Sequence, residues 1–321
     1  MDTYLVTGAA GFIGRSIAAE LLARGKKVRG IDNFATGKRE NLRGLEAMDF
    51  IEADINDGAA IARACSGVMC IFHEAAIPSV PRSIEDPVAS NHACVSGTVQ
   101  LLLAAKNAKV KRVIYAGSSS VYGNTPTLPK SEHMQPSPIS PYAVAKLSGE
   151  LYMKSFTAVY GLETVTIRYF NVFGPCQDPN SQYSGVLALF ALKMLAGDVP
   201  TIYGDGEQSR DFTFIQNVVH ANLLASEAGA DRVSGKVFNV ATAHRVTLNQ
   251  AVELLRQATG YSGEVRYGKE RGGDVKHSLA DISLAKEYLG YEPLVGFAEG
   301  IERTVAWYKT IAQSKSACTR S

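Results

Sequence analysis

Several features that would direct a first interpretation are scarce in this chain of 321 residues. Basic and acidic side chains almost cancel, with 33 Lys and Arg against 31 Asp and Glu and a net charge of +2. The composition therefore gives no electrostatic argument for a nucleic-acid or membrane-surface partner, and we expect neither. No apolar run reaches the roughly 20 residues needed to cross a membrane. A first strand is expected from residue 3, which leaves no room for a signal peptide, so we expect a cytoplasmic protein.

Cysteine is also scarce, and its distribution argues against a disulfide framework and a metal centre. The five cysteines are odd in number, scattered and without metal-ligand spacing; they are Cys65, Cys70, Cys94, Cys176 and Cys318. Free thiols in a reducing compartment fit this distribution best. His73 follows an expected strand and has no second His, Cys or acid at metal spacing. We therefore expect no metal and interpret His73 as a packed or hydrogen-bonded side chain.

The most informative stretch is at the beginning of the chain. Residues 3–14 combine a short apolar run, glycines at Gly8, Gly11 and Gly14, and a helical pattern that starts near Phe12. A strand, a glycine turn and a helix in this order can hold a pyrophosphate, because glycine permits close backbone approach and the helix directs free amides at the phosphates. The spacing is GxxGxxG and differs from the GxGxxG of many dehydrogenases.

Strand-like and helix-like segments alternate through the first half of the chain, including one long helix over residues 88–108. Such alternation predicts an α/β fold with a Rossmann-type, doubly wound parallel sheet. We expect a dinucleotide-binding domain over residues 1–170 and a smaller α/β substrate lobe over residues 171–321. Residues 212–242 are expected to rejoin the first domain.

An acidic residue follows the second expected strand, where a cofactor ribose would lie. Asp32 suits the two ribose hydroxyls and would repel a 2′-phosphate, which favours NAD over NADP. Lys38 and Arg39 are near enough in sequence to weaken that preference. Asp54, after the third strand, is interpreted either as an acceptor for the adenine amine or as a helix cap. The small residue Ala75 leaves room for a cofactor at the end of the fourth strand.

A hydroxyl-rich strand end and a helix beginning supply candidate chemistry. Ser118 ends the fifth strand, and Ser140 and Pro141 predict a helix start that places Tyr142 and Lys146 on one helix face. A phenol that acts as a base near neutrality needs its pKa lowered by roughly 2–3 units. A neighbouring ammonium and a nicotinamide cation are possible sources of that lowering.

These motifs together resemble those of a known family. The chain is similar, nearly end to end, to the extended short-chain dehydrogenases/reductases of the nucleotide-sugar epimerase/dehydratase group. The matching segments are residues 8–14, 142–146, 168–175, 204–212 and 271–275. The resemblance implies that Tyr142 is the base, that Lys146 holds the nicotinamide ribose and lowers the tyrosine pKa, and that Ser118 relays the proton of the sugar 4-hydroxyl.

The resemblance also implies the residues that line the two ligands. The cofactor would contact Gly8, Gly11, Phe12, Ile13, Gly14, Asp32, Asn33, Asp54, Ile55, Ala75, Tyr142, Lys146 and Phe170. The UDP-sugar would contact Ser118, Ser119, Ser120, Tyr142, Asn171, Val186, Tyr203, Arg210, Arg271, Asp274 and Ser278. Guanidinium groups suit the diphosphate oxygens.

The same resemblance suggests a reaction and a sugar. Dehydratases and decarboxylases of the group carry a carboxylate near the serine stretch, and Ser118, Ser119 and Ser120 carry none, which favours a 4-epimerase. Ser278 stands where glucose-only epimerases tend to have tyrosine, and a small residue leaves space for a 2-acetamido group. We therefore expect activity on UDP-GlcNAc and UDP-GalNAc, with UDP-Glc and UDP-Gal as further substrates. Two positions differ from the family pattern. Cys94 stands where relatives usually have Asn, and Ala188 stands where the N-acetyl enzymes have a proline.

Two alternatives remain open at this point. A UDP-glucuronate 4-epimerase or decarboxylase would need a cation for the substrate carboxylate, and Arg82 is a candidate. A catalytically silent NAD-binding regulator of the same fold would be expected to lack one of Ser118, Tyr142 and Lys146. Members of the family are often homodimers through two long helices, here about 92–108 and 142–160, and a homodimer is expected.

Overall fold

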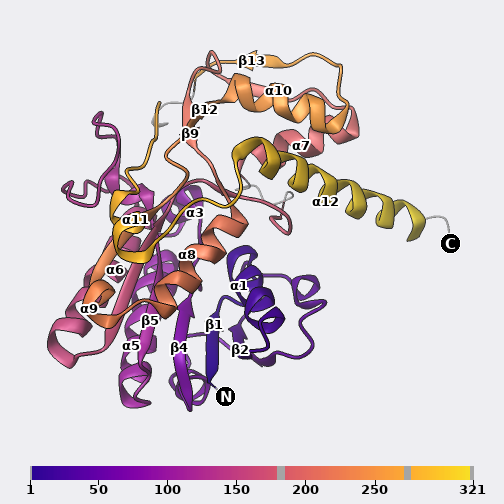
Figure 1. Cartoon of the computed structure of the whole chain (residues 1–321). Coiled ribbons are helices and arrows are strands. Elements are labelled where there is room, and N and C mark those ends of the chain that lie inside the picture. The colour runs from indigo at the N-terminus through magenta and orange to yellow at the C-terminus, as the bar shows by residue number, and fades with distance from the viewer. Residues whose placement is uncertain (1, 179–184, 271–275, 319–321) are drawn as a thin grey trace.

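A seven-stranded sheet forms the centre of the protein, and all its neighbouring strands are parallel (Figure 1). The computed structural model describes residues 2–178, 185–270 and 276–318. The strand order is β11-β6-β5-β4-β1-β2-β3. The strands are β1 (Thr3–Thr7), β2 (Lys27–Asp32), β3 (Asp49–Glu52), β4 (Val68–His73), β5 (Arg112–Ser118), β6 (Glu163–Tyr169) and β11 (Lys236–Val240). The predicted Rossmann-type α/β fold is confirmed.

Helices cover both faces of the sheet, as the near-continuous apolar strands require. One face packs α1 and α8 over the larger hydrophobic core, and the other packs α2, α5 and α6 over a second core. These helices are α1 (Phe12–Ala23), α2 (Gly58–Cys65), α5 (Gly97–Asn107), α6 (Pro141–Tyr160) and α8 (Ile215–Glu227). The carboxyl ends of the strands are left open between the two layers, which is where ligands bind in such sheets.

Short polar side chains fix where two of these helices begin. The Ser140 hydroxyl accepts a hydrogen bond from the Ala143 amide at 3.2 Å and Pro141 is the first residue of α6, as predicted. At the start of α2, the carboxylate of Asp57 accepts the amides of the second and third helical residues. The cap of this helix is therefore Asp57, and the interpretation of Asp54 as the cap is wrong.

The single helix predicted over residues 88–108 contains a π-helical turn and is not α-helical throughout. It consists of α4 (Pro87–Asn91), a π-helical turn η2 (His92–Ser96) and α5, preceded by the separate short helix α3 (Val80–Glu85). Asn91 and Gly97, which flank the turn, both keep right-handed helical angles, so the helix continues through it. The π-helical turn places buried Cys94 at the bulge. Such turns are often found at functional sites.

A second group of elements lies beyond the carboxyl ends of the central strands (Figure 1). It contains three two-stranded sheets, β10-β7, β12-β9 and β13-β8. Its elements are β7 (Val172–Phe173), α7 (Val186–Ala196), β8 (Thr201–Tyr203), β9 (Ser209–Asp211), β10 (Thr213–Phe214), β12 (Arg245–Thr247), α10 (Leu248–Thr259), β13 (Arg266–Gly268) and α12 (Phe297–Cys318). The remaining short helices are η1 (Arg39–Leu42), η3 (Ser119–Tyr122), α9 (Ala230–Val233) and α11 (Ser283–Leu289).

The chain returns to the central sheet after it has formed part of this second group. β11 pairs in parallel with β6 at the edge of the sheet, and α8 packs on the face that α1 also covers. The segment expected to rejoin the sheet therefore contributes its edge strand. The division into a domain of residues 1–170 and a lobe of residues 171–321 stays a prediction. In the part of the chain that the structure describes, no helix is both long and apolar enough to cross a membrane.

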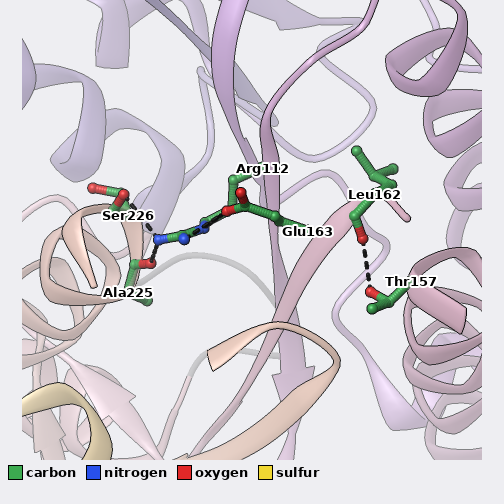
Figure 2. A network of polar contacts seen from close by, with 6 residues as sticks. All are labelled: Arg112, Thr157, Leu162, Glu163, Ala225 and Ser226. Atoms are coloured by element: carbon green, nitrogen blue, oxygen red, sulfur yellow. Dashed lines mark hydrogen bonds and ion pairs between the residues drawn. The ribbon is translucent and has the colours of Figure 1, made fainter. Parts of the chain in front are cut away.

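A buried ion pair anchors α8 at the amino end of the strands (Figure 2). The Arg112 guanidinium donates to Glu163 Oε2 from Nε at 2.9 Å and from Nη2 at 2.6 Å. Its remaining nitrogen donates to the carbonyls of Ala225 at 2.7 Å and Ser226 at 3.1 Å. A cation among the last carbonyls of a helix is electrostatically favourable. The contact fixes α8 at the end of the sheet far from the open carboxyl edge.

Candidate active site

The glycine turn between β1 and α1 depends on two close backbone contacts. Gly8 has a φ of +64°, and a Cβ there would lie 2.9 Å from the Ala75 amide nitrogen. A Cβ on Gly14 would lie 2.2 Å from the carbonyl oxygen of Gly8. Only glycine fits at either position. Because Gly11, the residue before α1, has no side chain, it leaves the first amides of α1 for an anionic ligand, which suits a pyrophosphate.

Asp32 lies at the end of β2 with its carboxylate held against the glycine turn. Its Oδ2 accepts the Ala10 amide at 2.9 Å and its Oδ1 accepts the Phe34 amide at 2.7 Å. Burial raises the pKa of Asp32, and the amides of Phe34 and Ala10 oppose that rise. Each carboxylate oxygen has room for a further donor, so a ribose diol can be held while the turn stays fixed.

The two basic residues that could weaken the preference for NAD are both engaged elsewhere. Lys38 Nζ lies 2.7 Å from Asp178 Oδ2, and Arg39 Nη2 lies 2.5 Å from Glu52 Oε1. The Arg39 guanidinium also lies 4.2 Å from the centre of the Phe34 ring. Neither cation is therefore directed at a 2′-phosphate. The negative charge of Asp32 therefore determines the preference between NAD and NADP, and the residues here fit NAD.

Asn33 and Asp54 meet across the ends of β2 and β3. Asn33 Nδ2 donates to Asp54 Oδ2 at 2.7 Å, while Asp54 Oδ1 accepts from the amide and the side chain of Asn56. Ile55 is buried, and its Cδ1 would lie 2.5 Å from a Cβ on Gly97. The structure thus brings Asn33 and Asp54 together at the carboxyl ends of β2 and β3, while the Ile55 side chain belongs to the core.

Three other residues expected at the cofactor site contribute differently. Phe12 and Ile13 are partly buried and pack against the larger core below the turn. Phe170 is fully buried, with its ring centre 6.2 Å from that of Tyr122. The Phe170 side chain therefore belongs to the core, and its expected contact with a cofactor stays a prediction.

Ser118, Tyr142 and Lys146 converge at the carboxyl end of β5. A hydrogen bond joins the hydroxyls of Tyr142 and Ser118, and Ser118 Oγ lies 2.8 Å from Ser120 Oγ. Lys146 is buried, and its Nζ donates to the Ala116 carbonyl at 2.9 Å. Both α6 side chains therefore reach the same strand end, on the helix face predicted from their spacing. A hydroxyl chain from Ser120 through Ser118 to Tyr142 can pass a proton.

The electrostatics of these groups differ from the simple expectation. Burial raises the pKa of Tyr142, with Cys94 adding to the rise and the Ser118 hydrogen bond opposing it. Burial also lowers the pKa of Lys146, opposed by the charges of Cys94 and Glu74. The predicted acidic phenol is thus not a property of the protein by itself at neutral pH. A positive charge brought by a bound nicotinamide is the remaining source of such acidity.

His73 forms the centre of a buried hydrogen-bond chain behind this site. The Thr7 hydroxyl lies 2.8 Å from His73 Nδ1 and accepts the Ala75 amide, while His73 Nε2 lies 2.9 Å from the Thr98 hydroxyl. Thr98 donates in turn to the Cys94 carbonyl at 2.6 Å. Burial, with a contribution from the Lys146 charge, lowers the pKa of His73 to about 3. The interpretation of His73 as a hydrogen-bonded structural residue is confirmed.

Glu74 was not among the residues expected at the site. It follows β4 directly, and its Oε1 accepts a hydrogen bond from the Tyr169 hydroxyl at 2.8 Å. The available signal was an acidic residue directly after a buried strand, at the edge where ligands bind. Sequence reasoning considered only the neighbouring Ala75, as a small residue that leaves room for a cofactor.

On the substrate side, the structure brings three expected residues to β9 and the chain beside it. Asn171 Nδ2 donates to the Asp211 carbonyl at 3.1 Å and to the Ser278 hydroxyl at 3.3 Å. Arg210 donates to the Ser209 carbonyl at 3.0 Å and to a carbonyl of the segment that leads to Ser278. The amide of Ser278 donates to the Ser209 carbonyl, so this segment and β9 are held in register.

The other expected substrate residues are distributed around this group. Ser119 and Ser120 belong to η3, directly after β5. Val186 is the first residue of α7, and Tyr203, at the end of β8, is 41% exposed. Arg271 and Asp274 lie outside the described residues.

A family model, the NAD dependent epimerase/dehydratase family, matches residues 4–241. The chain belongs to this family. It is 40% identical over 319 residues to a UDP-glucose 4-epimerase of Mycolicibacterium smegmatis, covering 96% of this chain and 99% of that one.

Two solved structures of this epimerase family extend the comparison. A UDP-N-acetylglucosamine 4-epimerase from Methanobrevibacter ruminantium, in complex with UDP-N-acetylmuramic acid, is 40% identical with a TM-score of 0.92, over 97% of this chain and 99% of that chain. A UDP-glucuronic acid 4-epimerase from Bacillus cereus, in complex with UDP-glucuronic acid and NAD, is 33% identical with a TM-score of 0.89, over 96% and 99%. The chain is accordingly an NAD-dependent isomerase of the nucleotide-sugar 4-epimerase type.

Proposed function

We propose that this epimerase inverts C4 of UDP-hexoses, with UDP-GlcNAc and UDP-GalNAc as its main pair and UDP-Glc and UDP-Gal as further substrates. The observation that carries the proposal is the convergence of Ser118, Tyr142 and Lys146 beside the glycine turn. The hydrogen bond between Tyr142 and Ser118 supports a proton path between a sugar hydroxyl and the base. The stretch Ser118 to Ser120 adds no carboxylate that could remove water or assist decarboxylation.

In this proposal each residue has a defined task. NAD, when bound, would supply the hydride acceptor for C4 and the hydride donor for the return to the opposite face. Tyr142 takes the 4-hydroxyl proton and gives it back, and Ser118 relays that proton. Lys146 holds the nicotinamide ribose from its buried position on α6. Asn171, Arg210, Arg271 and Asp274 hold the nucleotide diphosphate while the oxidised sugar turns.

The proposed preference for an N-acetyl group depends on the size of Ser278. Its hydroxyl accepts from Asn171 at 3.3 Å, so a larger side chain would extend into the space next to that residue. Ala188, where N-acetyl enzymes have a proline, is buried inside α7 and packs in the larger core. The difference at Ala188 therefore lies in the interior of a helix. The proposed preference for N-acetylated sugars depends on Ser278.

The test is to incubate the purified protein, without added cofactor, with a panel of UDP-sugars and to follow C4 inversion by proton NMR. We expect turnover of both N-acetylated sugars and loss of that turnover in Ser278→Tyr, with UDP-Glc turnover retained. Ser278→Ala is the matched control and should keep the N-acetyl activity. Equal N-acetyl turnover in wild type and Ser278→Tyr would refute the role of Ser278.

The same panel separates the alternatives. Turnover of UDP-glucuronate alone would refute the proposal and identify a UDP-glucuronate 4-epimerase. Release of CO₂ from that substrate would identify a decarboxylase. Retained NAD with no turnover of any UDP-sugar would identify a binding protein. The complete set Ser118, Tyr142 and Lys146 supports catalysis.

We also propose that two copies associate through the two long helices, about 92–108 and 142–160, together with α3 and α4, which contact α6. Apolar side chains are exposed along these helices, with Ile84 at 64%, Val88 at 77%, Leu151 at 58% and Val159 at 67% exposure. A row of such residues marks an association surface, and a second copy presents the same row. Sedimentation should give a dimer for wild type and a monomer for Leu151→Glu, whereas a monomeric wild type would refute the proposal.

Free thiols support the proposed cytoplasmic location. All cysteines among the described residues whose side chains are placed are free, and burial raises the pKa of Cys65 and Cys70 to about 12. Thiols of this kind persist in a reducing compartment.

A further inference from the structure

A carboxyl group that none of the motifs accounts for lies at the open edge of the sheet. Glu74 directly follows β4, and its backbone packs against the glycine turn, where a Cβ on Gly8 would lie 3.0 Å from the Glu74 carbonyl carbon. Its Oε1 accepts from the Tyr169 hydroxyl at 2.8 Å. The Tyr169 oxygen accepts from Asn222 Nδ2 at 2.9 Å. β4, β6 and α8 together therefore fix where this carboxyl lies.

The directions of these hydrogen bonds suit an ionised carboxylate. The amide nitrogen of Asn222 can only donate, so the Tyr169 hydroxyl is left to give its proton to Glu74. Asn222 is fully buried and also donates to the Val218 carbonyl, which fixes its orientation. Tyr169 thus serves as an oriented donor to Glu74 and not as an acceptor from it.

The groups that face Glu74 come from three elements besides its own. Lys146 and Tyr142 come from α6, Tyr115 from β5 and Tyr169 from β6. Lys146 is the one cation among these four. Burial raises the pKa of Glu74 to about 7, against the Tyr169 hydrogen bond and the Lys146 charge, which hold it down. A small change in nearby charge is therefore enough to move a proton on or off Glu74 at neutral pH.

We propose that Glu74 is a third ionisable group of the catalytic centre, whose proton occupancy follows the redox state of the bound NAD. The ring of NAD⁺ carries a positive charge that NADH lacks, and Glu74 lies at the edge of the sheet that holds the cofactor in this family. Glu74 is therefore ionised beside the oxidised cofactor and takes a proton from solvent when the cofactor is reduced. The inference rests on NAD binding and on the C4 oxidation of the proposed function.

The charges and atoms balance in this scheme. A hydride, with two electrons and one hydrogen, leaves C4 for the nicotinamide ring, and the hydroxyl proton goes to Tyr142. The ring loses one positive charge and the Tyr142 phenolate is neutralised, so these two changes cancel, and the solvent proton on Glu74 raises the net charge of the centre by one. When the ring is reduced without a sugar, Tyr142 gains no proton, and the proton on Glu74 offsets the lost ring charge. When the hydride returns to C4, Glu74 releases its proton to solvent.

The first experiment uses the holoenzyme and needs no sugar. Sodium cyanoborohydride reduces the bound NAD⁺, and the absorbance of the reduced nicotinamide gives the rate across the pH range. An ionised Glu74 stabilises NAD⁺, so we expect the wild-type rate to rise several-fold as the pH falls through the pKa that Glu74 has beside NAD⁺. That pKa lies below the value of about 7 that Glu74 has in the protein alone. Glu74→Gln, which mimics the protonated carboxyl, should show the fast rate at every pH. Glu20→Gln, the same change on the exposed face of α1, is the matched control.

A second variant tests Glu74 without removing it. Tyr169→Phe deletes the hydrogen bond that favours the carboxylate, so the inflection should move upward by about one pH unit. A purely structural role for Tyr169 would change the amount of bound NAD and leave the inflection where it was.

Infrared difference spectra of reduced minus oxidised holoenzyme report the proton directly. We expect a protonated-carboxyl band in wild type and its absence in Glu74→Gln. No such band, or the same pH profile in wild type and Glu74→Gln, would overturn the inference. Because cyanoborohydride replaces the sugar, these outcomes do not depend on whether the chain turns over UDP-sugars, so a failure of the proposed function is seen separately in the sugar panel.

Discussion

Replacement of Glu150 in the buried ion pair between α6 and β6 should destabilise the protein strongly. Arg168 donates to both oxygens of Glu150, from Nε at 2.9 Å and from Nη2 at 2.6 Å, and the two side chains are only 2% and 8% exposed. The Arg168 guanidinium also lies 4.7 Å from the centre of the Tyr122 ring. Glu150→Gln would leave this buried cation without a counter-charge. The expected loss is about 3–5 kcal/mol of the free energy of unfolding.

Urea unfolding at saturating NAD would measure this loss, because ligand occupancy must be equal in the variants compared. The control is Glu299→Gln, which breaks the Arg303 pair on α12, where the two side chains are 47% and 50% exposed. That change should cost less than about 1 kcal/mol. The double variant Glu150→Leu with Arg168→Met should recover most of the loss, because it removes both charges. A cost for Glu150→Gln as small as that of the control would refute the reasoning.

The remaining predictions concern the site itself. Tyr142→Phe should lower kcat by about 10³-fold, the usual contribution of a positioned base, while the absorbance of co-purified NAD is unchanged; retained turnover would reassign the base. Gly14→Ala places a Cβ 2.2 Å from the Gly8 carbonyl, so it should weaken NAD binding by about 10–100-fold in calorimetry, whereas Gly296→Ala, with open space around it, should not. His73 has a folded pKa of about 3, below its ordinary value, so the unfolded chain binds its proton first as the pH falls. Stability should therefore fall by up to about 1.4 kcal/mol per pH unit between about 6.5 and 3, and His73→Gln should flatten that slope by one proton in acid titration of unfolding.

The parts of the molecule that were predictable from the sequence depend on neighbours along the chain. The glycine turn and the beginning of α6 follow from local rules, and the structure shows both where they were expected. The same local rules placed Tyr142 and Lys146 on one helix face. Asp54 and Asp57 show the limit of such rules, because both are acids before α2 and only the fold decides which one caps it.

Features that depend on distant contacts could not be predicted in this way. The π-helical turn keeps the apolar pattern of an ordinary helix, so nothing in the pattern over residues 88–108 marks it. Glu74 gains its partner Tyr169 only when β4 and β6 are placed at the same sheet edge. The pKa of Tyr142 depends on how deeply the folded chain buries it, which spacing on a helix does not report.

The position of β11 has a consequence for synthesis of the chain. Its residues, Lys236–Val240, complete the edge of a sheet whose other six strands all lie before residue 170. A nascent chain that has just emerged up to that point would expose the bare edge of β6, and α8 would not yet cover its face. The first half must therefore wait for about 70 further residues, some seconds of translation, before its sheet is whole. A fragment cut at residue 170 would remain in that incomplete and aggregation-prone state.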